Sequence, residues 1–413
     1  MVYGCLYNYV KLPQKDCTNV TRKLFSLRIA IFTVIAVLIV SGSYCAGALS
    51  NLVPSQTPAE IPEFSLFWEA WHLVEENFYG ELPPSKTMTY AALRGALSAL
   101  NDPYTTFVEP QPRQLEKDDL HGSFGGIGVW LSQTQDGSFV LSPMREGPAI
   151  RAGVQDGDVL LGVDDTPITP QMGLSDVQVL IRGPVGSEVR LTIRREGVDD
   201  PLVLTIVREE IATPSVTWRM VKDQPDMGYI KITRFTERTP QELKEAIADL
   251  RDQGMARLVL DLRDNGGGLL TEAIQVAGQF LDKGVVLYER RRNAEEKPYP
   301  VQESGVVRDV PLAVLINGGT ASAAEIVAGA LQDYERGPLI GERTFGKGSV
   351  QLIYDLSDGS SLHVTAAQWL TPNRHQINGQ GLAPDVEVQL TDEDRAQGRD
   401  PQLERAVAYL MSQ

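Results

Sequence analysis

The chain is 413 residues long, which at ~150 residues per domain predicts two or three domains. Its composition, 42% hydrophobic and 22% charged, is typical of a folded globular protein and excludes an intrinsically disordered chain. The formal net charge of −16 gives an acidic surface that repels phosphate backbones, so we expect no nucleic acid among the partners.

Cysteine and histidine usage restricts the chemistry further. All three cysteines lie within the first 45 residues. The rest of the chain therefore has no disulfide, no cysteine nucleophile and no thiolate zinc site. The four histidines do not form the HExxH pattern of a zinc hydrolase. We expect neither a metal nor a cofactor.

Residues 1–56 are predicted to be an export segment followed by a linker. Residues 29–49 carry no charge and follow a leader with five basic residues and one acidic residue. The uncharged stretch is long enough to span a membrane, which takes ~20 mostly apolar residues, while residues 46–48 (AGA) also fit a signal-peptidase site. We favour a retained signal anchor over a cleaved signal peptide. By the positive-inside rule, everything after residue 50 is then extracytoplasmic, anchored to the cell membrane by one N-terminal helix.

The predicted secondary structure divides the rest of the chain into four regions. Residues 57–120 are predicted to be helical, because apolar residues recur at helical spacing from Phe67 onward. Residues 121–210 contain short alternating strands separated by glycine turns, which indicates a compact β-rich module. Residues 211–390 alternate strand and helix and indicate an α/β core. Residues 391–413 are predicted to be a C-terminal helix.

Ser322 is a candidate nucleophile. It lies in residues 317–326 (NGGTASAAEI), which follow an apolar strand and begin a helix. A serine among small residues presents its hydroxyl openly, and the N–H of Ala323 can then face a developing oxyanion. The alternative is structural, because Ser322 and Glu325 also form the S-x-x-E pattern of a capping box. Taken alone, this segment fits the capping box better.

Lys347 is the candidate base for such a serine. Its two flanking glycines allow close backbone approach, and burial lowers the pKa of a lysine so that the neutral amine can accept a proton. Gln351 falls on the same face four residues later. A solvated lysine in a glycine turn is the structural alternative. His363, in an alternating strand, is the second candidate base for a serine triad.

Two glycine-rich segments bear on anion binding. Residues 261–268 (DLRDNGGG) connect a strand to a helix, so their N–H groups could supply a second oxyanion donor, or could simply form a tight turn. Residues 341–347 match the G-x-x-x-x-G-K part of a phosphate loop. The next residue is Gly348 instead of Ser or Thr, and a strand is predicted to follow, which argues against nucleotide binding.

Taken together, these segments resemble the C-terminal processing peptidases, tail-specific serine proteases that use a Ser-Lys pair and carry a PDZ domain. The resemblance covers nearly the whole chain after residue 60. The segments that carry it are 101–105 (NDPYT), 124–129 (FGGIGV), 152–154 (AGV), 157–160 (GDVL), 261–268 (DLRDNGGG), 322–325 (SAAE), 344–351 (TFGKGSVQ), 377–379 (ING) and 384–385 (PD).

The resemblance implies a multidomain α/β fold with a helical N-terminal region, an inserted β-rich PDZ domain and a crotonase-like α/β peptidase core. It implies that Ser322 is the nucleophile, Lys347 the base and Gln351 the residue that orients the base. Ala323 and Gly267 are then the oxyanion donors.

Two positions depart from the usual family pattern. The sequence has Gly266 where the family often has proline, and Thr320 where it often has serine. Neither change removes a reactive group. They bear only on the shape of the oxyanion turn, and hence on the choice of Gly267 over Gly266 as donor.

In the PDZ-like module, a glycine-rich loop precedes a strand, where N–H groups can hold a peptide carboxylate. The expected peptide-binding positions are Gly126, Ile127, Gly128 and Val129. Alone, such a loop also fits an ordinary turn. Arg182 could link the module to the catalytic part through an ion pair and so regulate the enzyme, although a solvated hairpin arginine is the simpler interpretation.

The predicted function is a serine endopeptidase that cleaves exported protein substrates near their C-termini. The expected partners are protein or peptide C-termini and the membrane; a homo-oligomer is left open. The alternative is a membrane-tethered, non-catalytic PDZ scaffold. A scaffold would not need Ser322 and Lys347 together.

Overall fold

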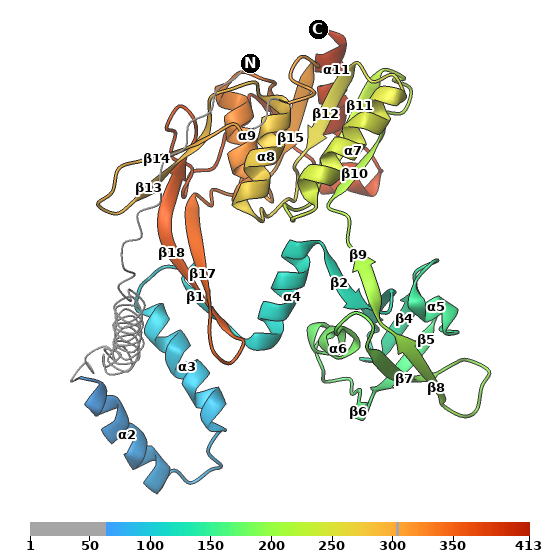
Figure 1. Cartoon of the computed structure of the whole chain (residues 1–413), viewed down its shortest axis with the longest axis vertical. Coiled ribbons are helices and arrows are strands. Elements are labelled where there is room, and N and C mark those ends of the chain that lie inside the picture. The colour runs from blue at the N-terminus through green and yellow to red at the C-terminus, as the bar shows by residue number, and fades with distance from the viewer. Residues whose placement is uncertain (1–62, 303–304) are drawn as a thin grey trace, which may run out of the picture. The chain divides into compact units, whose positions relative to one another are not determined.

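The computed structural model describes residues 63–302 and 305–413 (Figure 1). The predicted export segment, residues 1–56, lies outside these described residues. None of the described helices is long and apolar enough to cross a membrane. The chain divides into two compact units, residues 1–84 and residues 85–413.

The described part of the first unit contains the helix α2 (Phe64–Asn77). Its apolar residues recur as predicted, at Phe67, Trp71 and Val74. It ends where Phe78 adopts an extended backbone, with φ −70° and ψ 127°. A helical N-terminal segment is therefore confirmed; of the region expected to be helical, residues 57–62 lie outside the described residues and Thr106–Val108 form a short strand.

The second unit begins with a helical and extended segment that leads into the β-rich module. Its elements are α3 (Ser85–Ser98), β1 (Thr106–Val108) and α4 (Pro110–His121). The rings of Tyr90 in α3 and Phe107 in β1 pack with their centroids 4.7 Å apart. The helix α4 starts with proline in its first turn, where the missing N–H costs no hydrogen bond, and Gly122, with φ 80°, caps its C-terminal end.

The β-rich module is a six-stranded sheet with two short helices. In the order β3-β4-β5-β7-β8, with β6 on β5, its strands are β3 (Val129–Gln133), β4 (Phe139–Pro143), β5 (Asp158–Val163), β6 (Thr166–Pro167), β7 (Glu188–Arg194) and β8 (Leu202–Val207). The helices are α5 (Pro148–Arg151) and α6 (Leu174–Ile181). Alternating strand residues such as Val189, Leu191 and Ile193 are fully buried and form the module's own core.

The module is joined to the rest of the unit by a two-stranded ribbon. The chain enters it through β2 (Ser123–Gly126) and leaves through β9 (Glu209–Ala212). These strands pair antiparallel, with Ser123 opposite Ala212. The module is therefore an insertion between α4 and the sheet of the core.

The core is built on a second six-stranded sheet. In spatial order its strands are β10 (Val216–Met220), β11 (Met227–Ile232), β12 (Arg257–Asp261), β15 (Leu312–Ile316), β16 (Leu339–Gly341) and β19 (Val386–Glu387). All neighbours from β11 onward are parallel, and only β10 is antiparallel. The alternation of strands and helices predicted an α/β core, and this prediction is confirmed.

Helices cover both faces of this sheet (Figure 1). One face packs against α7 (Thr239–Asp252), α8 (Leu270–Phe280) and α9 (Ala323–Asp333). The other packs against α11 (Pro401–Met411), through Ala406 and Leu410. Because the sheet is buried on both sides, its strands are almost continuously apolar, as in Leu312–Ile316, rather than alternating.

A separate antiparallel sheet stands beside the core. It contains β1 together with β13 (Val285–Arg291), β14 (Lys297–Pro300), β17 (Ser349–Asp355) and β18 (Ser361–Leu370). The strand predicted after Gly348 is β17, so the segment 341–347 does not open a helix as a phosphate loop would. The strand predicted at residues 285–289 belongs to this sheet and not to the parallel one.

The C-terminal stretch differs from its prediction. One helix was expected over residues 391–413, and the structure has two, α10 (Asp392–Ala396) and α11. Gly398, with φ 68°, follows α10, and Asp400 caps the start of α11. The break therefore has a local cause in glycine and in an Asp-Pro helix start.

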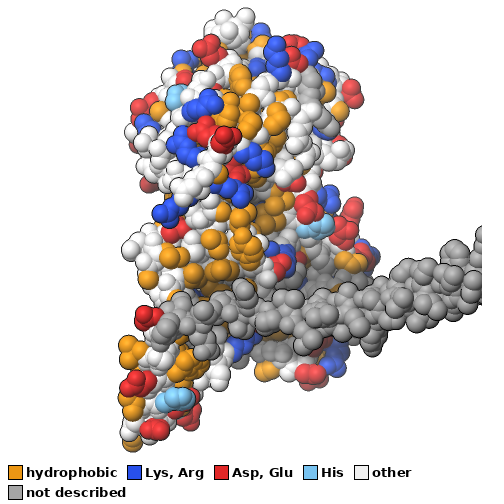
Figure 2. Space-filling model, turned by 60° about the vertical axis from the view of Figure 1, so that its left-hand side comes forward, with side chains coloured by type: hydrophobic (Ala, Val, Ile, Leu, Met, Phe, Trp, Pro, Cys, Tyr) orange, Lys and Arg blue, Asp and Glu red, His pale blue; other side chains and the backbone are white. Residues whose placement is uncertain are grey.

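On the face drawn in Figure 2, acidic and basic side chains are interspersed, and apolar side chains gather between them. The expectation of no nucleic-acid partner stays a prediction.

Candidate active site

Ser322 lies at the turn between β15 and α9, and its backbone is strained. Its φ of 54° and ψ of −119° are values that non-glycine residues rarely adopt, at a cost of ~1–3 kcal/mol, and such strain clusters at active sites. Its N–H donates to Glu325 Oε2 at 2.9 Å, which is one half of the capping box. Among the described residues, the Ser322 hydroxyl makes no side-chain capping bond. The capping interpretation therefore leaves the hydroxyl unused.

Lys347 lies in the loop between β16 and β17 and is about half-buried. Burial lowers the pKa of its amine, and the negative charge of Glu116 partly opposes this by raising it. Its Nζ is 5.1 Å from the centre of the Tyr104 ring, a contact that favours the ammonium form. Burial therefore favours the neutral amine, while Glu116 and the Tyr104 ring favour the ammonium form.

A cleft of about 300 Å³ joins these residues. Ser322, Lys347 and Gln351 all line it, as does Ala323, whose N–H begins α9. Much of the remaining lining is apolar and comes from Leu269, Leu270, Ile326, Val350 and Trp369. This apolar wall explains why the lysine amine is poorly solvated.

Glu325 fastens the serine turn to the lysine loop. It is fully buried, and its two oxygens accept four hydrogen bonds. Oε1 accepts from Thr344 Oγ1 at 2.5 Å and from the Gly346 N–H at 2.8 Å. Oε2 accepts from the N–H groups of Ser322, at 2.9 Å, and of Lys347, at 2.8 Å. Burial raises the pKa of this carboxyl, and the four donors work against that rise.

The glycine turn after β12 lies against Ser322. A Cβ added to Gly267 would lie 2.8 Å from Ser322 Cβ, so only glycine fits there. The Gly267 N–H donates to Asn265 Oδ1 at 2.9 Å, and an oxyanion bound to this N–H would compete with that bond. Gly266 and Gly268 line the cleft itself. Gly267 as oxyanion donor stays a prediction.

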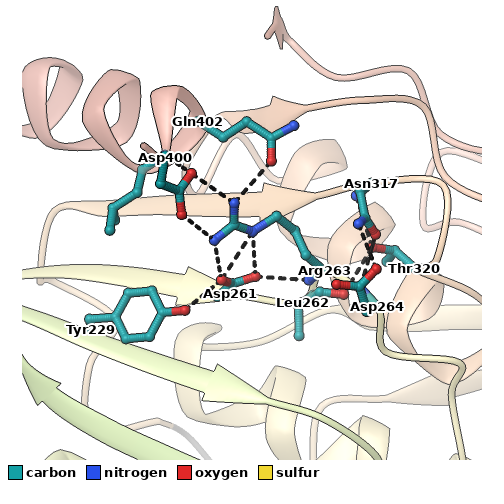
Figure 3. A network of polar contacts seen from close by, with 10 residues as sticks. Tyr229, Asp261, Leu262, Arg263, Asp264, Asn317, Thr320, Asp400 and Gln402 are labelled. Atoms are coloured by element: carbon teal, nitrogen blue, oxygen red, sulfur yellow. Dashed lines mark hydrogen bonds and ion pairs between the residues drawn. The ribbon is translucent and has the colours of Figure 1, made fainter. Parts of the chain in front are cut away.

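Polar side chains tie this turn to the serine segment (Figure 3). Asn317 Nδ2 donates to Asp264 Oδ1 at 2.8 Å, and Asn317 Oδ1 accepts from the Asp264 N–H at 2.9 Å. Thr320 Oγ1 donates to the Leu262 carbonyl at 2.8 Å. Thr320 therefore supplies the hydroxyl that a serine would supply at this position.

Gln351 and His363 also line the cleft, but within the described part of the chain neither is hydrogen-bonded to the lysine amine. Gln351 Nε2 donates to Ser349 Oγ at 2.8 Å. His363 Nε2 lies 3.3 Å from Glu116 Oε2, within ion-pair distance, although among the described residues it has no partner in hydrogen-bond geometry. The histidine is therefore directed to Glu116 and not to Ser322.

The β-rich module has its own apolar groove, with a volume of about 500 Å³. Ile127, Gly128 and Val129 line it, next to β3 and α6. Gly126, the fourth expected position, is in β2 and pairs with Glu209. The groove has the position that an added peptide strand would take beside β3.

Arg182 connects this groove with α4. Its Nη1 lies 3.2 Å from Asp118 Oδ2, and its guanidinium carbon lies 3.8 Å from the centre of the Phe124 ring. Both side chains of the ion pair are only 17% exposed. The interpretation of Arg182 as a solvated hairpin residue is therefore wrong.

Sequence analysis missed two residues of the site. Glu116 comes from α4, more than 200 residues before Lys347, and no local pattern marks it. Glu325 was noticed as a helix cap and as part of the segment 322–325 (SAAE) of the family resemblance, but it was given no role in the site. Its spacing from Ser322 was visible, whereas its bonds to residues 344–347 depend on the tertiary fold.

Comparisons with known proteins agree with this architecture. Residues 226–388 match the model of peptidase family S41, and residues 139–195 match that of the PDZ domain. The chain is 37% identical over 330 residues to the carboxy-terminal-processing protease of Bartonella bacilliformis, covering 79% of this chain and 75% of that protein. It is 35% identical over 332 residues to the carboxy-terminal processing protease CtpA of Bacillus subtilis, covering 80% and 70%.

A plant protein is equally similar. The chloroplastic carboxyl-terminal-processing peptidase 2 of Arabidopsis thaliana is 36% identical over 409 residues, covering 91% of this chain and 77% of that protein. The likeness extends over both the β-rich module and the core. The chain therefore belongs to peptidase family S41, as a serine peptidase of the C-terminal processing type with a PDZ domain.

Proposed function

We propose that Ser322 is the nucleophile of this peptidase and that the neutral amine of Lys347 is its general base. The observation that carries the proposal is one cleft that holds both a strained serine at a helix start and a lysine whose pKa is lowered by burial. Since the chain is an enzyme, the non-catalytic scaffold is set aside.

In the proposed reaction, Ser322 Oγ attacks the scissile carbonyl carbon while its proton moves to Lys347 Nζ. The oxyanion accepts the Ala323 N–H at the positive end of α9 and a second N–H from the turn 266–268, with Gly267 as the predicted donor. Lys347 then gives the proton to the leaving amine, and water hydrolyses the acyl ester by the same route. We propose that Gln351 orients the lysine in the substrate complex, where its amide leaves the Ser349 hydroxyl and turns to Lys347.

A serine-directed fluorophosphonate tests the assignment directly. We expect one label per chain, located on Ser322 by mass spectrometry of the digested protein. Lys347→Ala should slow labelling strongly, and Ser322→Ala should abolish it. Label on another residue, or labelling that Lys347→Ala does not slow, would contradict the Ser-Lys pair.

We also propose that the module's groove captures the free C-terminus of an exported protein substrate. N–H groups of residues 126–129 would bind the carboxylate, and the apolar groove would hold the terminal side chains. The support is the groove's position beside β3 and its largely apolar lining.

The ion pair between Arg182 and Asp118 connects the groove of the β-rich module to a helix that lines the catalytic cleft. Arg182 lines the groove, and Asp118 is on α4, whose Glu116 and Leu120 line the catalytic cleft. A carboxylate bound near Arg182 would compete with Asp118. We infer that Arg182 has a regulatory role of this kind.

We propose that residues 29–49 anchor the chain in the cell membrane with the catalytic part outside the cytoplasm. The support is an uncharged stretch behind a basic leader. Protease added to cells whose outer layers have been removed, but whose cell membrane is intact, should digest the catalytic part. A fully protected catalytic part would contradict this topology.

We further propose that the α/β core is crotonase-like, as the family resemblance implies. Its parallel strands β11, β12, β15 and β16, with α8 and α9 on one face, support the proposal. Superposition of an experimental structure of this chain on the crotonase fold tests it.

A further inference from the structure

A buried ionic network lies at the start of the turn that faces Ser322 (Figure 3). Arg263 follows Leu262, just beyond the end of β12, and is only 7% exposed. Its Nη1 and Nη2 donate to the two oxygens of Asp400, both at 2.9 Å. On the other side, Nη2 donates to Asp261 Oδ2 at 2.6 Å and Nε to Asp261 Oδ1 at 3.0 Å.

The C-terminal part of the chain supplies half of this network. Asp400 is 137 residues after Arg263 and is the N-cap of α11, where its Oδ1 also accepts from the Leu403 N–H at 3.0 Å. Gln402 is fully buried, and its Oε1 accepts from Arg263 Nη1 at 3.0 Å. The guanidinium is thus held from two sides, by β12 and by α11.

The chain runs directly from this network into the turn. After Arg263 the chain passes through Asn265, whose carbonyl accepts from the Ala321 N–H at 2.9 Å, to the glycines that line the cleft. The space is tight, because an added Cβ at Gly267 would lie 2.8 Å from Ser322 Cβ. A displacement of Arg263 would therefore reach the serine segment.

We propose that Asp400 is a positioning residue for catalysis, through which α11 fixes Arg263 and hence the oxyanion turn. A charged, bidentate pair fixes direction as well as distance, so it suits this role. The proposal rests on Ser322 as the nucleophile. The helix has its own apolar anchors, Ala406 and Leu410, so we expect it to remain docked when Asp400 is replaced.

Two substitutions in the full chain separate positioning from capping. Asp400→Ser keeps an N-cap side chain but cannot reach Arg263, whereas Asp400→Asn keeps one acceptor and loses the charge and the second bond. We expect kcat and the fluorophosphonate labelling rate at Ser322 to fall about tenfold to a hundredfold in Asp400→Ser, and less in Asp400→Asn. KM should change by less than about twofold, because the ground-state contacts of the substrate remain.

Asp394 provides a matched control. Its carboxylate also binds an arginine, Arg399, through Nη2 at 2.6 Å and Nε at 3.0 Å, and it lies in the first turn of α10. Among the described residues, no hydrogen bond or ion pair joins Asp394 to Arg263. Asp394→Ser should leave both rates unchanged.

Thermal unfolding of each variant, followed by circular dichroism, completes the test. If both Asp400 variants keep the wild-type kcat and labelling rate while Tm falls, the role of Asp400 is structural and the proposal is wrong. If the wild-type chain is not labelled at Ser322, it is the nucleophile assignment that fails. A graded loss of both rates with unchanged KM supports the proposal.

Discussion

Ser322 and Lys347 are close enough to share one cleft, and the proposed chemistry makes them a single functional group. Ser322→Ala and Lys347→Ala should each remove nearly all peptidase activity without unfolding the protein, and the double variant should be little worse, because residues that act as one unit are not additive. The measurement is kcat/KM on a peptide, with circular dichroism as the check on folding.

The contradicting outcome is quantitative. A general base contributes ~10²- to 10⁴-fold, so Lys347→Ala with more than about a tenth of wild-type turnover would exclude the lysine from this role. His363→Ala tests the histidine alternative. We expect little effect on the chemical step, because His363 is directed to Glu116.

The pH dependence follows from the surroundings of Lys347. Only the neutral amine acts as base, and burial lowers its pKa from the ordinary ~10.4, so activity should rise with pH along an acidic limb below that value. Glu116 stabilises the ammonium form. Glu116→Gln should therefore lower the pKa of Lys347 and move the acidic limb of kcat/KM to lower pH.

A matched control for this shift is Glu109→Gln on the same segment, since Glu109 binds Arg94 and does not line the cleft. Glu109→Gln should leave the acidic limb of kcat/KM at the same pH as in the wild type. If Glu116→Gln moves the acidic limb of kcat/KM to higher pH, or does not move it, a group other than Lys347 titrates.

Some of the site was predictable because its signals are local. Ser322 stands among small residues at a helix start and Lys347 between glycines, and both patterns are visible in a few letters of sequence. The strain at Ser322 and the position of Glu116 were not predictable. They depend on how β15 meets α9 and on where α4 comes to lie, which only packing decides.

At the scale of elements, Glu325 joins the helix α9 to the loop before β17. Glu325→Gln replaces acceptor oxygens by an amide group that itself donates, so at least one of the four N–H or O–H donors loses its partner. We expect a loss of about 2–3 kcal/mol in the free energy of unfolding, together with a large loss of kcat. Urea denaturation and steady-state kinetics measure the two effects.

Thr344→Ser serves as the control, because it keeps the hydroxyl that donates to Glu325. Its stability should stay within about 1 kcal/mol of the wild type. If Glu325→Gln were as stable and as active as Thr344→Ser, the carboxylate would not be the link between serine turn and lysine loop.

The elements themselves were largely predictable, and their grouping was not. Periodicity gave α2 and the alternating strands and helices of the core. It did not assign β13 to the antiparallel sheet, because the sequence pattern of a strand does not show which strands it pairs with. The two C-terminal helices had a visible signal, Gly398 followed by Asp400 and Pro401, which the single predicted helix overlooked.

At the scale of the whole molecule, the PDZ groove and the catalytic cleft should act on the same substrate. A peptide with a free C-terminus should be cleaved with a higher kcat/KM than its C-terminally amidated twin, because amidation removes the carboxylate and leaves the cleaved sequence unchanged. Equal values for the two peptides would contradict carboxylate capture and would not affect the Ser-Lys assignment.

The same pair of peptides tests the ion pair on α4. Arg182→Gln and Asp118→Asn should each reduce the advantage of the free C-terminus, since both break the contact between groove and helix. Arg190→Gln is the control, because Arg190 pairs with Asp165 on the exposed surface of the same module. If the free peptide keeps its full kcat/KM advantage over the amidated peptide in Asp118→Asn, α4 does not transmit the effect of C-terminus binding to the catalytic cleft.

The ribbon of β2 and β9 has a consequence for how such a protein arises. The Gly122 carbonyl accepts from the Thr213 N–H at 3.0 Å, so the two chain ends of the core touch where the module leaves it. A core without residues 123–212 would need only a tight turn to close. A gene segment that encodes such a module can therefore be gained, exchanged or lost in evolution while the catalytic scaffold keeps its connectivity.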